Sequence, residues 1–271
     1  MPMTPGRFLS FDQVAGDYDL TRVIPDAQMD QIVRLLGRET HLENGGLFLD
    51  AGVGTGRFAA PLARLYPGQV AGADVSLPMM GQVAAKSVPG TLSLAQADLQ
   101  RLPFRSGVFS GVLMVHILHL LERWPLALSE AQRVLVPKAG VLFLGIEIGG
   151  RSVLVDFYFE RARARRVLAA SLGTAGLSPA LSFLRRRERD GGIGASVSLL
   201  ETPTLAWKRT VPTAQTLDAL ARRTYSQMWS IPETDHAEIL TEAQGYARQT
   251  FRKESAAENL PSRFSLYAVR W

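Results

Sequence analysis

The sequence predicts an α/β protein with a doubly wound, mostly parallel seven-stranded sheet and a helical cap. Three observations lead to this fold class. Short apolar runs alternate with stretches of helical spacing between residues 47 and 147, which is the pattern of βαβ units. A glycine-rich turn follows the first of these runs. The 271 residues are 46% hydrophobic, which is enough to build a sizeable core.

The elements follow in order from an N-terminal helix. Asp26 can cap a helix that carries Met29, Ile32, Val33 and Leu36 at helical spacing. Beyond this helix the pattern predicts strands and helices in alternation. They are a strand at Leu47–Ala51, a helix at Arg57–Leu65, a strand at Val70–Asp74, a helix at Met79–Lys86, strands at Thr91–Ala95 and Val108–Val115, a helix at Pro125–Val136 and a strand at Val141–Glu147.

The second part of the sequence is less regular. It predicts helices at Arg151–Ala170, Pro179–Arg189, Thr213–Tyr225 and Asp235–Arg252, with strands at Thr204–Thr210 and Ser262–Trp271. We therefore expect one domain, whose core comprises residues 1–150 and 201–271 and whose helical cap comprises about residues 151–200.

Composition excludes several classes of protein. The chain contains no cysteine, which excludes a disulfide scaffold, a thiolate metal site and a cysteine nucleophile. No apolar run is long enough to span a bilayer, and no signal-peptide pattern is present. We expect a cytoplasmic protein. No cluster of His, Asp and Glu has metal-ligand spacing, so no metal is expected.

The net charge of +5 is concentrated in one segment. Residues 151–190 carry 9 basic and 4 acidic groups, whereas the flanking regions are nearly neutral. Because 26 of the 30 basic residues are arginine, one interpretation is a compositional bias of the host proteome, with a solvated helix surface. The alternative is a basic patch for an anionic substrate or for RNA.

The most informative motif is the run from Asp50 to Gly56, in which glycines alternate directly after an apolar strand. Glycine permits positive φ and close approach of the backbone to a ligand, and the following helix start offers free N–H groups. A glycine-rich turn alone is a weak signal, because any tight turn between a strand and a helix favours glycine.

Further residues at the ends of the next two strands strengthen this interpretation. Asp74 closes the second predicted strand, where a carboxylate can accept hydrogen bonds from ribose hydroxyls. Met79 follows and can cover an adenine ring. Asp98-Leu99 ends the third strand, where a carboxylate and a backbone N–H can bind the edge of a base. Together these positions predict a nucleoside site.

These motifs resemble those of the class I S-adenosylmethionine-dependent methyltransferases, in the small-molecule branch whose members act in quinone biosynthesis. The glycine spacing is G-x-G-x-G, not the G-x-G-x-x-G of dehydrogenases. The resemblance covers roughly residues 11–147 and includes Phe11-Asp12 with Ala15 and Tyr18-Asp19, Asp74-Val75-Ser76-Leu77-Pro78-Met79, Leu102-Pro103-Phe104, and Arg133-Val134-Leu135-Val136-Pro137. One departure is Lys138-Ala139-Gly140, where the family usually has Gly-Gly after the proline.

The resemblance implies S-adenosyl-L-methionine as the cofactor and a small molecule as the methyl acceptor. It also implies roles for individual residues: Asp50 near the methionine amino group, Gly52, Gly54 and Gly56 along the methionine half, Asp74 on the ribose, Val75 and Met79 against the adenine, Asp98 and the Leu99 backbone at the adenine edge, His116 beside the methyl-transfer region, and Tyr18 and Arg22 closing over the cofactor.

Methyl transfer is an in-line displacement, so alignment supplies much of the rate, and a general base is needed only for a protonated acceptor. His116 is the leading catalytic candidate, followed by His119 and Glu147; the alternative is that these residues only pack. His41 and His236 lie in polar stretches and are predicted to be on the surface. An RNA methyltransferase, a nicotinamide-dependent oxidoreductase and a non-catalytic binding protein remain rival interpretations.

Overall fold

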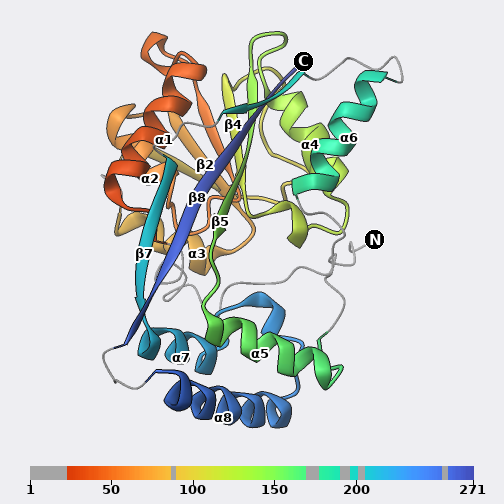
Figure 1. The fold of residues 1–271 in the computed structure, drawn as a ribbon. Coiled ribbons are helices and arrows are strands. Elements are labelled where there is room, and N and C mark those ends of the chain that lie inside the picture. The colour runs from red at the N-terminus through yellow and green to blue at the C-terminus, as the bar shows by residue number, and fades with distance from the viewer. Residues whose placement is uncertain (1–22, 87–89, 169–176, 190–195, 201–204, 252–255) are drawn as a thin grey trace. The chain divides into compact units, whose positions relative to one another are not determined.

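We analysed a computed structural model of the chain, which describes residues 23–86, 90–168, 177–189, 196–200, 205–251 and 256–271 (Figure 1). The chain forms two compact units. Unit 1 comprises Met1–Glu147, Leu172–Leu205 and Phe264–Trp271, and unit 2 comprises Ile148–Ser171 and Ala206–Arg263. Two long strands, β5 (Val141–Gly149) and β8 (Ala257–Arg270), contribute residues to both units.

Unit 1 is built on a mostly parallel sheet. Parallel pairing joins β3 to β2, β2 to β1, β1 to β4 and β4 to β5, and the strand order is β3-β2-β1-β4-β5-β8-β6. The β6 strand runs antiparallel to the end of β8. The bounds are Phe48–Ala51 for β1, Val70–Asp74 for β2, Leu92–Gln96 for β3, Gly111–Val115 for β4 and Ser196–Leu200 for β6.

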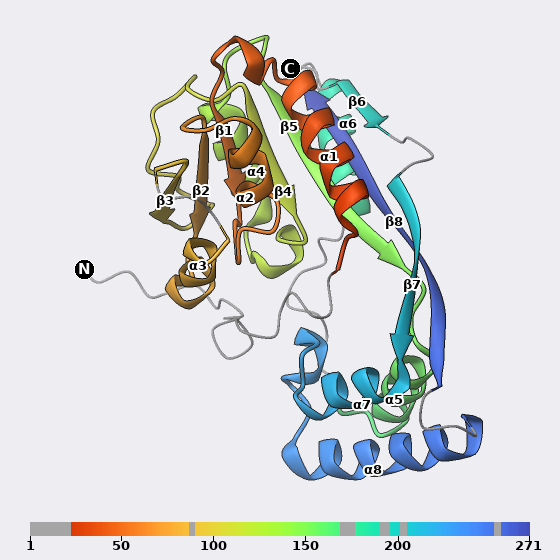
Figure 2. The same cartoon turned by 90° about the vertical axis from the view of Figure 1, so that its left-hand side faces the viewer.

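Helices cover both faces of this sheet (Figure 2). On one face α1 (Asp26–Glu39) packs against α2 (Ala59–Leu65). On the other, α4 (Trp124–Val134) and α6 (Leu177–Arg189) lie together, and the Trp124 ring meets the Phe183 ring edge-on at 5.3 Å. The short helix α3 (Leu77–Ala84) follows β2. The predicted doubly wound, mostly parallel α/β fold is confirmed.

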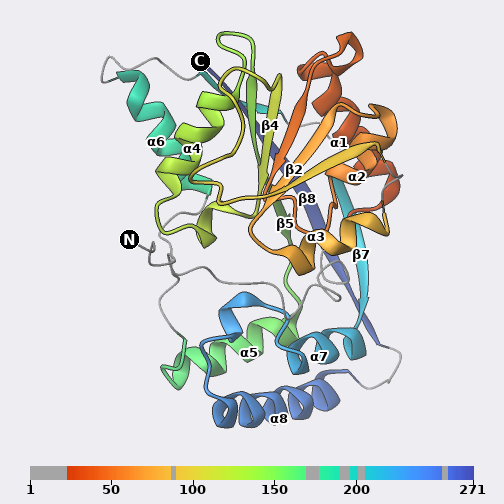
Figure 3. The same cartoon turned by 180° about the vertical axis from the view of Figure 1, so that it is seen from behind.

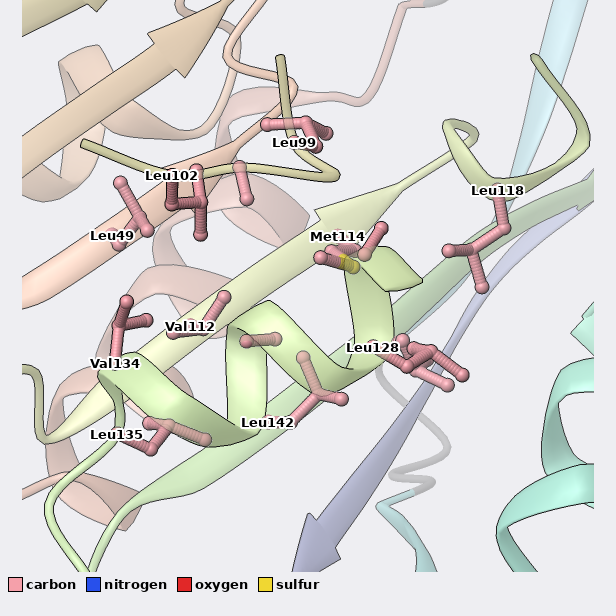
Figure 4. Close-up of a cluster of buried hydrophobic side chains, with 14 of the residues drawn as sticks. Leu49, Leu99, Leu102, Val112, Met114, Leu118, Leu128, Val134, Leu135 and Leu142 are labelled. Carbon is pink, nitrogen blue, oxygen red and sulfur yellow. The ribbon is translucent and has the colours of Figure 1, made fainter. Parts of the chain in front are cut away.

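One buried hydrophobic cluster of unit 1 lies between the sheet and α4. Figure 4 shows Val112 and Met114 of β4 and Leu142 of β5 beside Leu128 and Val134 of α4. Each of these side chains is buried, as their apolar character at strand and helix spacing predicts. Burial of a side chain of this size contributes about 1.5–3 kcal/mol to folding, so this contact fixes α4 and the carboxyl end of β4.

Unit 2 is mainly helical. Helices α5 (Val153–Ala164), α7 (Thr213–Ala221) and α8 (Glu233–Thr250) pack on one another (Figure 3), and β7 (Ala206–Pro212) pairs antiparallel with residues 257–263 of β8. Tyr158 and Phe159 of α5 are buried in its core. These aromatic residues therefore pack within unit 2.

Arg161 of α5, and Arg165 directly after this helix, are paired with acidic residues of α8. Arg165 forms ion pairs with Glu238 at 2.5 Å and Glu242 at 2.6 Å, and Arg161 also pairs with Glu242. Arg161 and Arg165 therefore have their charges compensated within unit 2.

Two expectations for single residues are wrong. Asp26 is not the N-cap of α1: Pro25 holds that position in an extended conformation, and no side chain caps the helix. His236 is not on the surface. It is buried, and its Nδ1 lies 2.7 Å from the Tyr158 hydroxyl oxygen. In the compact units, α6 packs on α4 in unit 1, whereas α5 packs with α7 and α8 in unit 2; the division into a core and a 151–200 cap stays a prediction.

Candidate active site

The glycine turn after β1 has a backbone that only glycine adopts readily. Gly52, Gly54 and Gly56 have φ of 89°, 51° and 77°. A Cβ atom on Gly52 would lie 2.9 Å from Ile117 Cγ1, and one on Gly56 would lie 2.9 Å from Val83 Cγ1. Gly52 and Gly56 are therefore constrained both by conformation and by space.

Asp74 links this turn to the end of β2. Its Oδ2 accepts a hydrogen bond from the Gly54 N–H at 2.9 Å, and its Oδ1 accepts one from the Ser76 N–H at 2.9 Å. Ser76 in turn caps α3 by accepting from the Met79 N–H at 3.2 Å. The carboxylate is thus fixed in orientation by two backbone groups.

Asp50 is the buried carboxylate of the site. It lies at 4% exposure in β1, and its Oδ2 accepts one hydrogen bond, from the Ala59 N–H at 3.1 Å. Burial raises the pKa of Asp50 to about 7, with the Ala59 hydrogen bond opposing the rise and the charge of Asp74 adding to it. An adjacent cation would favour the ionised form of this carboxyl group.

The segment between β3 and β4 brings Asp98 and Leu99 to the same edge of the sheet. The Asp98 Oδ1 accepts from the Gln100 N–H at 2.8 Å and from Gln100 Nε2 at 3.1 Å. Leu99 is buried in the core of unit 1. Directly before Asp98, the Ala97 N–H donates to the Asp74 carbonyl at 2.8 Å, so the start of this segment is anchored to β2.

His116 follows β4 with a left-handed backbone, at φ 52°. Its Nε2 accepts a hydrogen bond from the Glu147 N–H at 3.1 Å. A backbone N–H can only donate, so a neutral His116 ring carries its proton on Nδ1. A non-glycine residue in this region costs free energy, and such residues cluster at functional sites.

The Glu147 side chain forms a buried ion pair that was not predicted from the sequence. Arg57 Nη2 donates to Glu147 Oε2 at 2.7 Å, with the two side chains only 12% and 7% exposed. Arg57 follows the glycine motif and Glu147 lies in β5, 90 residues away. No local sequence pattern connects residues this far apart. The one local signal is the position of Arg57, directly after the last glycine of the motif.

The structure brings most of the predicted site residues to the carboxyl ends of neighbouring strands. Val75 is exposed, whereas Met79 is buried, with its Cε 3.3 Å from the position a Cβ on Gly54 would take. His119 lies in the short helix Leu118–Leu120, and His41 is exposed. Tyr18 and Arg22 lie outside the described residues.

Within the described ranges, no group of three or more His, Asp or Glu side chains is placed to hold a metal ion. In that same part of the chain, no helix has both the length and the apolar character needed to cross a membrane.

Comparison with known proteins identifies the class. A solved structure from Anabaena variabilis, described as a methyltransferase of an antibiotic biosynthesis pathway, matches with a TM-score of 0.58 at 17% identity, over 88% of this chain and 96% of its own. This likeness shows the fold alone, which is that of a methyltransferase. The model of the family "Methyltransferase domain" matches residues 49–143, which contain the glycine turn, Asp74, Asp98 and His116.

Two curated relatives define the family more closely. The ubiquinone/menaquinone biosynthesis C-methyltransferase UbiE of Syntrophotalea carbinolica is 33% identical over 163 residues, which are 58% of this chain and 68% of the relative. The malonyl-[acyl-carrier protein] O-methyltransferase of Legionella pneumophila is 30% identical over 137 residues, 49% of this chain and 47% of the relative. The chain belongs to the class I S-adenosylmethionine-dependent methyltransferases, in the quinone-biosynthesis-like branch. Nothing in these comparisons favours RNA, nicotinamide or a non-catalytic role.

Proposed function

We propose that this chain binds S-adenosylmethionine along the carboxyl ends of β1 and β2 and the β3–β4 segment, and transfers the methyl group to a small-molecule acceptor. The observation that carries the proposal is the Asp74 carboxylate, held by the N–H groups of Gly54 and Ser76. A carboxylate fixed in this way is preorganised to accept hydrogen bonds from the two hydroxyls of a ribose.

The methionine end of the cofactor fits the residues around Asp50. Its buried carboxylate has one hydrogen bond from the backbone and a pKa raised to about 7, so an ammonium group nearby would stabilise its charge. The left-handed turn at Gly52 and Gly56 excludes side chains from the backbone at the same place. These features support a site for a ligand that carries both a ribose and an ammonium group.

The adenine end fits the β3–β4 segment. Asp98 is oriented by two hydrogen bonds from Gln100 and can accept from an exocyclic amine, while the Leu99 N–H can donate to a ring nitrogen. Val75, exposed at the end of β2, can pack against the ring. Tyr18 and Arg22 stay predicted cofactor contacts from the N-terminal segment.

The cofactor supplies a methyl group on a sulfonium, which is transferred directly to a nucleophilic atom of the acceptor. The chain has to hold that atom in line and exclude water. His116 and the Arg57–Glu147 pair border the ends of β4 and β5 and would orient the acceptor there. We favour a small-molecule acceptor over RNA because Arg161 and Arg165 are already paired with glutamates.

Calorimetric titration with S-adenosylhomocysteine tests the cofactor site. We expect Asp74→Ala to weaken binding about a hundredfold, because two hydrogen bonds to a charged acceptor are lost at about 1.5 kcal/mol each. Asp30→Ala is the matched control: Asp30 is an exposed aspartate of unit 1 that pairs only locally with Arg34, and its removal should leave the affinity unchanged. Equal affinities for all three proteins would refute the site.

A transfer assay tests the acceptor class. Labelled S-adenosylmethionine is incubated with the protein and with separated metabolite and RNA fractions of a cell extract. We expect label in the metabolite fraction, and its loss with Asp74→Ala. Label that appears in RNA alone would contradict a small-molecule acceptor while leaving the cofactor site intact.

A further inference from the structure

Outside the proposed site, three hydrogen bonds join side chains of α4 to the backbone of the β3–β4 segment. Arg133 donates from Nη2 to the Leu102 carbonyl at 3.0 Å and from Nη1 to the Phe104 carbonyl at 2.8 Å. Glu130 Oε2 accepts from the Leu102 N–H at 2.8 Å. Two side chains of one helix thus hold both backbone groups of Leu102 and one of Phe104.

The two side chains also hold each other. Arg133 Nε donates to Glu130 Oε1 at 2.7 Å, and Nη2 donates to Oε2 at 2.8 Å, which is a bidentate pair. The adjacent guanidinium lowers the pKa of the Glu130 carboxyl. Because the planar fork uses three nitrogens at once, lysine cannot reproduce this arrangement.

The held residues lie close to Asp98 in the chain. The Arg101 N–H donates to the Asp98 carbonyl at 2.9 Å, so Asp98 to Arg101 form a turn that ends one residue before Leu102. Leu99 and Leu102 are both buried in the core cluster that includes α4 residues (Figure 4). The Asp98 turn is therefore fixed by β2 on one side, through Ala97, and by α4 on the other.

We propose that Arg133 and Glu130 act as positioning residues that hold Asp98 and Leu99 in place to bind the adenine edge, and that they thereby set a preference for a 6-amino purine. The inference rests on the proposed cofactor site. Neither side chain would touch the cofactor. Their effect would pass through the backbone of residues 98–102, so the loss of either contact would loosen the Asp98 turn while the glycine turn and Asp74 stay in place.

Ligand discrimination distinguishes this role from a purely structural one. The probes are S-adenosylhomocysteine and S-inosylhomocysteine, in which an oxo group replaces the 6-amine. The measured quantity is the ratio of their two dissociation constants. In the wild-type protein we expect the adenine form to bind at least tenfold more tightly, because Asp98 can accept from an amine and is repelled by an oxo group.

We expect Arg133→Leu to reduce this ratio about tenfold, mainly by weakening the adenine ligand. Arg133→Lys keeps the charge but loses the planar guanidinium, so its ratio of dissociation constants should lie between those of the wild-type protein and Arg133→Leu. Glu130→Gln keeps an acceptor for the Leu102 N–H and should have the smallest effect. Arg270→Leu is the control, because Arg270 forms a similarly exposed ion pair with Glu39 in unit 1.

An unchanged ratio in Arg133→Lys and Glu130→Gln, even with a lower Tm, would show that the pair is only structural and would overturn the inference. These two conservative variants keep the test valid if Arg133→Leu fails to fold. Failure of the wild-type protein to bind S-adenosylhomocysteine would instead refute the proposed function. The two failures are therefore distinguishable.

Discussion

The two compact units differ in where some of their left-handed residues lie and in whether their charged side chains are buried or paired. In unit 1, four of the left-handed residues lie at the carboxyl ends of strands, namely Gly52, Gly54, Gly56 and His116, and the buried Asp50 has its pKa raised to about 7. In unit 2, the left-handed residues Arg166 and Arg223 lie just after helices α5 and α7, where such a conformation commonly ends a helix.

This difference indicates which unusual features are functional. A left-handed residue after a helix satisfies carbonyl groups of the last turn and needs no ligand to explain it. The glycine turn lies beside a buried carboxylate that accepts one backbone hydrogen bond, and the ligand proposed for unit 1 accounts for a buried charge at this place. In unit 2, the charges of Arg161 and Arg165 are compensated by glutamates of α8.

The largest expected effect tests whether the glycine turn is constrained by space as well as by conformation. We expect Gly56→Ala to lower the free energy of unfolding by about 3 kcal/mol, because left-handed strain and the 2.9 Å contact with Val83 add together. Gly68→Ala is the matched control, since Gly68 has φ 76° with nothing within 4 Å of the added Cβ. It should cost only about 1 kcal/mol. If urea unfolding shows the same loss of unfolding free energy in Gly56→Ala and Gly68→Ala, the close contact with Val83 does not contribute.

The second prediction separates a positioning role of His116 from a general base. Gln can still accept the Glu147 N–H bond, whereas Leu cannot. We therefore expect His116→Gln to keep kcat within about threefold, and His116→Leu to lower it about thirtyfold through the unpaired N–H. The rates are measured on the acceptor found by label transfer. A loss of a hundredfold or more in both variants would identify His116 as a base.

The third prediction uses the raised pKa of Asp50. If its carboxylate binds the cofactor ammonium, protonation below about pH 7 removes that attraction. The affinity for S-adenosylhomocysteine should then fall about tenfold between pH 8 and pH 6. Calorimetry across this range measures it. Asp50→Asn should bind weakly at every pH, and a pH-dependent affinity in that variant would assign the titration to another group.

Much of unit 1 was predictable because its signals are local. Asp50 near the end of its strand, the glycine alternation and Asp74 lie within 25 residues, and β2 begins and ends where the alternation predicts. The mostly parallel sheet follows from the spacing of these elements. After Pro137 the chain has three residues, Lys138-Ala139-Gly140, where the family usually has Gly-Gly. The left-handed Lys138, at φ 63°, lies in this turn.

Contacts between distant segments could not be predicted in this way. Arg57 and Glu147 meet only because β5 lies next to β4 in the sheet. His236 was predicted to be on the surface because its neighbours are polar, yet helical periodicity turns it towards Tyr158. The charges of Arg161 and Arg165 are likewise compensated by residues 73 to 81 positions further along, in α8.

The smallest expected effect tests whether unit 2 is a nucleic-acid surface. Arg165 is 25% exposed and its partners Glu238 and Glu242 are partly solvated, so its ion pairs are screened. We expect Arg165→Ala to lower the Tm by about 2 °C or less at low salt, with less effect in 1 M NaCl. Arg163→Ala, at an exposed position of α5, is the control. Because the Arg165 charge is already balanced, neither variant should change RNA binding in a fluorescence anisotropy titration. Micromolar RNA binding that falls steeply with salt and weakens in both variants would show that this surface binds RNA.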